Sequence, residues 1–223
     1  MSSTITSCAR CGTCCSKGGP GLHMQDVELY ASGSLTKDDL LTLRKGERVR
    51  DNVRGGFTDL DHEVVRVRSS ADSSACCFYD PVGKGCAIYA ERPLECRVLR
   101  CWEPAGLISM YDRDRAGRLD LIPGGSALGE LIREHEQRCG IPEVRELVTG
   151  VTSGLEKALK GLADMLRFEA SLRSGLQDRT GASDQALEFL FGRPLPRILP
   201  LYGLRVTQQD GTLTITPVHG RSG

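Results

Sequence analysis

The sequence has no segment of the kind that crosses a membrane or directs secretion. No apolar run approaches the roughly 20 residues that a membrane-spanning helix needs. The opening residues, MSSTITSCAR, contain neither a basic segment nor an apolar stretch after it, so they do not resemble a secretory signal peptide. We therefore expect a cytoplasmic protein without membrane contact.

The chain also lacks net charge, since 29 basic residues are balanced by 29 acidic ones. The total charge therefore gives no reason to expect nucleic acid as a partner. Neither a Walker P-loop nor a GxGxxG fingerprint is present. The four histidines are scattered, and no Ser/His/Asp arrangement indicates nucleophilic catalysis. These absences leave no catalytic acid–base set for the sequence to predict.

What the sequence does contain is ten cysteines, none of them after Cys139. The first four form a C-x2-C-x2-C-C run, namely Cys8, Cys11, Cys14 and Cys15. A second group follows at Cys76, Cys77, Cys86, Cys96 and Cys101. In a reducing compartment, clustered cysteines more often bind metal or do redox chemistry than form disulfides. A chain of 223 residues also has the length to bury a core without such crosslinks. The pattern therefore predicts metal ligands.

The spacing of these cysteines suits two kinds of metal centre. A C-x2-C step places two thiolates on one tight loop, and four thiolates can hold either zinc or the corners of an iron–sulfur cluster. Thiolates are soft donors, which argues against magnesium and calcium. One four-thiolate site would leave six of the ten cysteines unused, whereas two would leave two. We therefore expect two centres, or one polynuclear centre with an extra site, and spacing alone leaves zinc and iron both open.

Hydrophobic periodicity predicts helices separated by short strands. The predicted helices cover residues 24–31, a segment led by Leu35 with a stripe at Leu40, Leu41 and Leu43, and residues 126–138, 142–173 and 184–191. The predicted strands cover residues 62–68 and 118–122, short pieces within 76–102, and a hairpin of 204–208 and 212–218 turned at Asp210-Gly211. Gly140 is a good position for a left-handed cap that would leave Cys139 at a helix end.

These elements predict an α+β fold. We expect a Cys-rich, metal-organised module with short strands and helices over residues 1–140. We expect it to pack on a mainly helical part over residues 141–223 that ends in a β-hairpin. The two parts can equally form one continuous domain.

The cysteine motifs carry a family resemblance. Three strings are involved: the N-terminal CxxCxxCC run, Cys77-Phe78-Tyr79-Asp80, and the CxIYxxRPxxCR string from Cys86 to Arg97. Together they resemble the YkgJ-type cysteine-cluster proteins, a family described as a zinc- or iron-chelating domain. The resemblance covers about residues 8–140, because a Cys-Gly pair such as Cys139-Gly140 also closes the module in relatives.

The resemblance implies metal binding by the cysteines at matching positions. These candidate ligands are Cys8, Cys11, Cys14, Cys15, Cys77, Cys86, Cys96 and Cys139. Cys76 and Cys101 are extra to the common pattern. Arg92-Pro93 and Arg97 fit a structural role beside the centre, and a surface arginine paired with Glu91 or Glu95 is the competing interpretation.

Two functions follow from this reading. The first is a structural or metal-handling module that holds one or two centres, iron–sulfur ahead of zinc, with a protein partner bound through the C-terminal helices. The second is an iron–sulfur-dependent modifying enzyme. The flagellin lysine methylase is distantly similar through the Cys motif, which raises an S-adenosylmethionine-dependent protein methyltransferase as the alternative.

Overall fold

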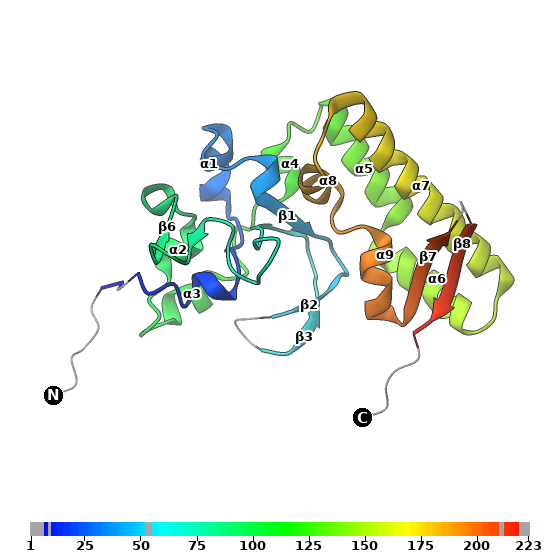
Figure 1. The fold of residues 1–223 in the computed structure, drawn as a ribbon, viewed down its shortest axis with the longest axis horizontal. Coiled ribbons are helices and arrows are strands. Elements are labelled where there is room, and N and C mark those ends of the chain that lie inside the picture. The colour runs from blue at the N-terminus through cyan, green and yellow to red at the C-terminus, as the bar shows by residue number, and fades with distance from the viewer. Residues whose placement is uncertain (1–6, 9, 52–54, 210–211, 219–223) are drawn as a thin grey trace.

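The computed structural model describes residues 7–8, 10–51, 55–209 and 212–218. Short strands and short helices make up the N-terminal half, and longer helices make up most of the C-terminal half (Figure 1). The chain ends in an antiparallel hairpin of β7 (Leu204–Gln209) and β8 (Thr212–Pro217). The predicted α+β fold and its terminal hairpin are confirmed, while the predicted turn at Asp210-Gly211 lies outside the described residues. None of the described helices has the length and apolar character needed to cross a bilayer.

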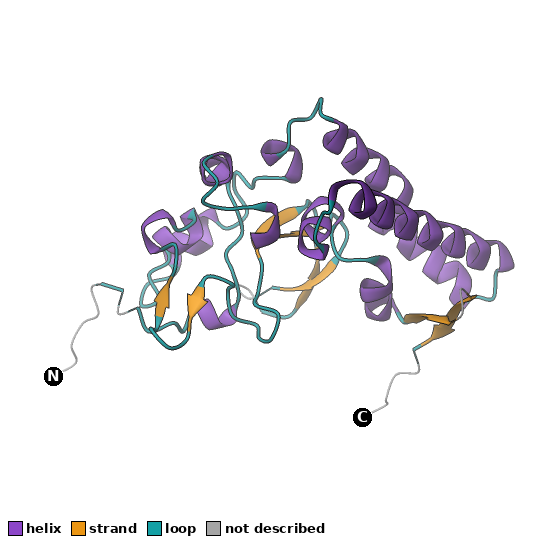
Figure 2. Ribbon diagram, turned by 45° about the horizontal axis from the view of Figure 1, so that its top comes forward, coloured by secondary structure: helices purple, strands orange, loops and turns teal. Residues whose placement is uncertain are grey.

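The N-terminal half is built from three two-stranded antiparallel sheets (Figure 2). β1 (Leu40–Leu43) pairs with β4 (Val64–Val67), which confirms the strand predicted at 62–68. β2 (Arg48–Arg50) pairs with β3 (Phe57–Asp59), and β5 (Tyr79–Asp80) with β6 (Gly85–Cys86). Short helices precede and follow these strands. Before β1 lie η1 (Cys15–Lys17), η2 (Met24–Asp26), α1 (Val27–Ala31) and η3 (Lys37–Asp39), and after β6 lie η4 (Tyr89–Glu91), α2 (Leu94–Val98), α3 (Ala105–Met110) and α4 (Arg118–Leu121).

Two predictions of secondary structure in this half are wrong. The segment predicted as a helix from Leu35 to Leu43 is the short η3 followed by strand β1. In β1 the burial alternates with the two-residue period of a strand: Leu40 and Thr42 are buried, and Leu41 and Leu43 lie on the other, partly exposed face. The strand predicted at 118–122 is helix α4, because the Asp120 carboxylate accepts a hydrogen bond from the Gly117 N–H (2.8 Å) and so caps a helical turn.

The C-terminal half consists of α5 (Ala127–Cys139), α6 (Ile141–Thr152), α7 (Glu156–Thr180), α8 (Asp184–Phe191), α9 (Leu195–Ile198) and η5 (Leu199–Tyr202). α5 and α8 confirm the helices predicted there. The single helix predicted over 142–173 is two helices, since the chain turns at Gly154 with φ +79°. Gly140 is extended (φ −53°, ψ 144°) rather than left-handed, because α6 begins at the next residue.

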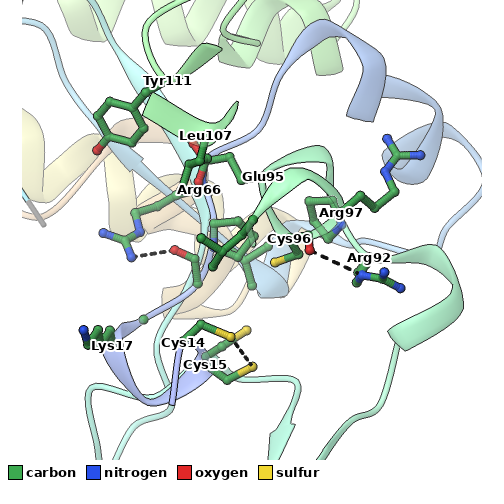
Figure 3. Close-up of a pocket in the computed structure, with 18 of the residues that line it drawn as sticks. Cys14, Cys15, Lys17, Arg66, Arg92, Glu95, Cys96, Arg97, Leu107 and Tyr111 are labelled. Atoms are coloured by element: carbon green, nitrogen blue, oxygen red, sulfur yellow. Dashed lines mark hydrogen bonds between the residues drawn. The ribbon is translucent and has the colours of Figure 1, made fainter. Parts of the chain in front are cut away.

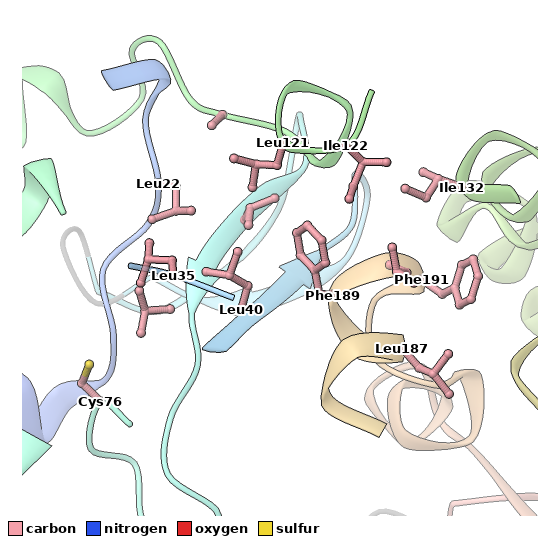
Figure 4. Close-up of a cluster of buried hydrophobic side chains, with 14 residues drawn as sticks. Leu22, Leu35, Leu40, Cys76, Leu121, Ile122, Ile132, Leu187, Phe189 and Phe191 are labelled. Carbon is pink, nitrogen blue, oxygen red and sulfur yellow. The ribbon is translucent and has the colours of Figure 1, made fainter. Parts of the chain in front are cut away.

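The buried apolar side chains form two clusters. One lies between the β1–β4 sheet and α8, and it includes Leu40, Val65, Phe189 and Phe191 (Figure 4). The other joins α6, α7, α9 and β7, and it includes Leu162. Helix α8 follows the long C-terminal helices in sequence but packs on the N-terminal sheet. The division at residue 140 therefore stays a prediction.

Candidate metal centre

The N-terminal cysteine run is coiled into a tight loop. Arg10 and Gly12 take positive φ angles of 52° and 76°, and the Ser16 N–H donates to the Gly12 carbonyl at 2.9 Å. This curl brings the Cys14 and Cys15 Sγ atoms to 3.9 Å from one another (Figure 3). A Cβ atom on Gly12 would lie 2.1 Å from the Tyr79 hydroxyl, so only glycine fits at this turn.

The second cysteine group lies against this loop through backbone hydrogen bonds. The Cys76 N–H donates to the Cys15 carbonyl at 2.8 Å, and the Ser74 hydroxyl donates to the Ser16 carbonyl at 3.0 Å. Cys86 lies on β6 and Cys96 on α2. The two cysteine groups, distant in the sequence, are therefore brought to one place by the fold.

They meet at a large open cavity of about 1490 Å³. Eight of the ten cysteines line it: Cys8, Cys11, Cys14, Cys15, Cys76, Cys86, Cys96 and Cys101. Cys8, Cys11, Cys14 and Cys101 are exposed, whereas Cys15, Cys86 and Cys96 are partly buried and Cys76 is buried. The thiols thus reach from solvent at the rim to the cavity wall.

The thiols inside the cavity influence one another's ionisation. Burial and, after it, the neighbouring thiols of Cys14, Cys76 and Cys86 together raise the pKa of Cys15 to about 12. Burial is also the main cause that holds the pKa of Cys96 well above its usual range, and the thiols of Cys76, Cys14, Cys15 and Cys86 add to it. These thiols therefore stay protonated in the absence of a cation, and binding of a metal ion would release protons.

Cys76 differs from this group. A hydrogen bond from the Cys77 thiol, followed by one from the Phe78 backbone and the charge of Arg66, lowers the pKa of Cys76 to about 7 against the effect of burial. The same hydrogen bond raises the pKa of Cys77. Cys76 is thus a buried thiol that ionises near neutral pH, which suits a metal ligand.

A buried carboxylate fixes the second motif to the N-terminal segment. Glu95, one residue before Cys96, accepts hydrogen bonds from the Gly21 N–H (2.9 Å) and from Arg115 Nη1 (2.7 Å). Its Oε1 also lies 3.4 Å from His23 Nε2. These contacts hold α2, and with it Cys96, against the chain that follows the first cysteine run.

Asp26 makes a second link of the same kind. One carboxylate oxygen accepts a hydrogen bond from the Leu94 N–H (2.8 Å), and the other accepts one from the His23 N–H (3.0 Å). Arg97 lies 3.6 Å from Asp26, so its partner is neither Glu91 nor Glu95. Arg92 donates to the Tyr89 carbonyl at 2.7 Å. The arginines of the CxIYxxRPxxCR string therefore brace the loop.

Two candidate ligands are not among the residues that line the cavity. Cys77 is partly buried and packs against the apolar cluster around β1 and β4. Cys139 is fully buried in the C-terminal cluster, where its carbonyl accepts a hydrogen bond from Arg44. Cys76 and Cys101, in contrast, line the cavity. The signal for Cys76 is its adjacency to Cys77, whose thiol hydrogen-bonds to it.

The donor set fits a thiolate-ligated metal centre. Several soft donors converge on one cavity, and their pKa values are raised first by burial and then by the neighbouring thiols, both of which a bound cation would offset. Within the described ranges, no three His, Cys, Asp or Glu side chains already stand at the spacing of a bound ion. Cys14 and Cys15, with sulfurs 3.9 Å apart, are the closest approach to such a set.

Comparison with known proteins identifies the N-terminal part. Residues 7–115 match the family described as "CxxCxxCC: Putative zinc- or iron-chelating domain". No curated protein and no solved structure matched the chain. The match supports metal binding and confirms the resemblance to the cysteine-cluster proteins, and it ends before Cys139.

Proposed function

We propose that the N-terminal module holds one or two iron–sulfur or zinc centres through thiolates at the cavity. One observation carries the proposal: Cys14, Cys15, Cys76, Cys86 and Cys96 come from separate segments and influence one another's ionisation on one cavity wall. Thiols of a merely structural kind would be dispersed through the core, as Cys139 is.

Within this proposal, the inner thiols bind first and the exposed ones complete the set. Cys8, Cys11 and Cys101 lie at the rim, on segments with few buried side chains that can move toward a bound ion. Cys77 and Cys139 do not line the cavity, and their role as ligands remains a prediction from the sequence.

An iron–sulfur centre is favoured over zinc because of the number of thiols. A structural zinc site closes with four ligands, and eight cysteines line this cavity. The test is anaerobic purification followed by metal and sulfide analysis and an absorption spectrum. Absorbance at about 400 nm together with acid-labile sulfide would identify iron–sulfur, whereas a colourless protein with stoichiometric zinc would identify zinc.

The metal would act first as a structural element. The loop of residues 10–19 contributes little to the apolar clusters and is fixed mainly by hydrogen bonds, so a bound metal would supply much of its folding free energy. Removal of the metal should raise hydrogen exchange in this loop while α7 stays protected. A metal-free protein with an equally protected loop would overturn the proposal.

The cavity also favours the second candidate, a modifying enzyme. It continues from the thiols past Arg66 and Glu95 to Tyr111, so a small molecule could lie beside the centre. An iron–sulfur-dependent, S-adenosylmethionine-dependent protein methyltransferase would bind this cosubstrate in the metal-loaded state only. Equilibrium dialysis with labelled S-adenosylmethionine, before and after metal removal, separates the enzyme from the module.

The cellular setting of the module completes the proposal. We place it in the cytoplasm, where cysteine clusters stay reduced. We assign a protein partner to the C-terminal helices, where Leu155 and Leu159 are exposed at the start of α7. A cross-linking experiment with cells that carry a Leu155→Lys, Leu159→Lys variant tests this assignment, since the variant should lose the cross-linked partner.

A further inference from the structure

The cavity contains a guanidinium that the described residues leave largely unpaired. Arg66, on β4, extends into the cavity (Figure 3). Its Nη2 donates to the Gly19 carbonyl at 2.7 Å. Within the part of the chain that the structure describes, its other N–H groups have no hydrogen-bond partner, and no carboxylate lies within 4.0 Å of it. Burial is the main cause that lowers the pKa of Arg66, so its desolvation is poorly compensated.

A second guanidinium lies beside the first. The Arg115 side chain is 6% exposed, and its Nη1 donates to Glu95 at 2.7 Å. Its Nε is buried and has no hydrogen-bond partner among the described residues. The proximity of Arg115 further lowers the pKa of Arg66, so the two cations lie close enough to repel. Glu95 acts on both guanidiniums, and Asp51, Asp61 and Asp112 also line the cavity.

The cavity lining also includes large apolar side chains. Leu43, Val64, Trp102, Leu107 and Ile108 are among its lining residues. The whole cavity, about 1490 Å³, exceeds the roughly 300–1,000 Å³ of common small-molecule sites. There is therefore room for an organic ligand in addition to the thiol cluster.

We propose that this end of the cavity binds a small organic carboxylate, held by Arg66 with Arg115 and packed on the apolar wall. A guanidinium pairs with a carboxylate through two parallel hydrogen bonds. A monoanion would supply one negative charge to the remaining N–H groups of Arg66. A phosphate dianion would place surplus negative charge beside Glu95 and the thiolates. This site is additional to the proposed metal centre and does not depend on which metal the thiols hold.

The test is calorimetric titration of the protein as purified anaerobically. The probe is cyclohexanecarboxylate, and cyclohexanecarboxamide is an uncharged control of the same shape. The carboxylate should bind at least about tenfold more tightly than the amide, as expected for charge-assisted hydrogen bonds. Arg66→Gln should remove this preference, Arg66→Lys should keep part of it, and inorganic phosphate should bind more weakly than the carboxylate.

A matched control and a metal analysis make the result decisive. Arg100→Gln removes another cavity-lining arginine, which is 66% exposed and pairs with Glu103 at 3.6 Å, and it should leave the carboxylate affinity unchanged. Equal binding of carboxylate and amide by the wild type would overturn the proposal without any variant. So would tighter binding of phosphate, or an Arg66→Gln protein that loses metal but keeps its carboxylate affinity. If the protein contains no metal after anaerobic purification but still prefers the carboxylate, the proposed metal centre is contradicted and the carboxylate site is supported.

Discussion

The contact between Glu95 and Arg115 offers the sharpest test of how the fold positions its cysteines. The Glu95 side chain is 11% exposed and that of Arg115 is 6% exposed, with 2.7 Å between the charged atoms. At an effective dielectric constant of about 20, two unit charges at this separation attract by about 6 kcal/mol, which is an upper bound because desolvation opposes it. Removing one partner of a buried pair costs about 3–5 kcal/mol, since the other charge stays buried without a partner.

We therefore expect Glu95→Gln to lower the free energy of unfolding by about 3 kcal/mol. The amide keeps an acceptor for the Gly21 N–H but loses the charge that faces Arg115. The matched control is Glu103→Gln, which breaks an ion pair at 3.6 Å between side chains that are 65–66% exposed. That control should cost no more than about 1 kcal/mol, since exposed pairs are screened by water.

The assay is anaerobic urea unfolding of wild type and both variants at equal metal content. Arg115→Met, alone and combined with Glu95→Gln, completes a double-mutant cycle. We expect a coupling free energy of about 2 kcal/mol between the two positions. A Glu95→Gln variant within about 1 kcal/mol of wild type would show that this carboxylate does not hold α2 to the N-terminal segment. The argument for the placement of Cys96 would then fail.

Three further predictions test the loop, the ligands and a buried histidine. Gly12→Ala should lower the free energy of unfolding by at least about 3 kcal/mol and lower the metal content, because its Cβ would lie 2.1 Å from a tyrosine hydroxyl. The control is Gly154→Ala at φ +79°, whose Cβ meets no atom within 4 Å and which should cost about 1–2 kcal/mol. Urea unfolding distinguishes the two variants. Cys76→Ser should reduce bound metal, measured by elemental analysis, while Cys139→Ser should retain it, and equal losses would refute the cavity assignment. Burial lowers the pKa of His135, so the unfolded chain takes up a proton first as the pH falls below about 6.5. Wild type should therefore lose stability from pH 7.5 to 5.5 more steeply than His135→Gln; equal slopes would show that His135 does not titrate differently on unfolding.

Local sequence was sufficient wherever a single signal dominated. Helix α8 is marked by Ser183, whose hydroxyl accepts a hydrogen bond from the Ala186 N–H, and by Gly192 after its end. Local sequence was misleading at Leu40–Leu43, where closely spaced leucines fit either a helix or a strand. There the pairing with Val64–Val67 decides the strand, and that pairing is a long-range contact.

The division of roles among the cysteines shows the same limit. The sequence by itself determined the match to the cysteine-cluster family and the prediction of thiolate ligands, because soft donors at C-x2-C spacing favour zinc or iron whatever the surrounding fold. Only the tertiary structure decided which thiols share a cavity. It places Cys76 there, with Cys77 and Cys139 elsewhere, because buried groups such as Glu95 and Asp26 join segments that lie about 70 residues apart in the chain. Such contacts depend on the whole folded chain, and no local pattern of residues records them.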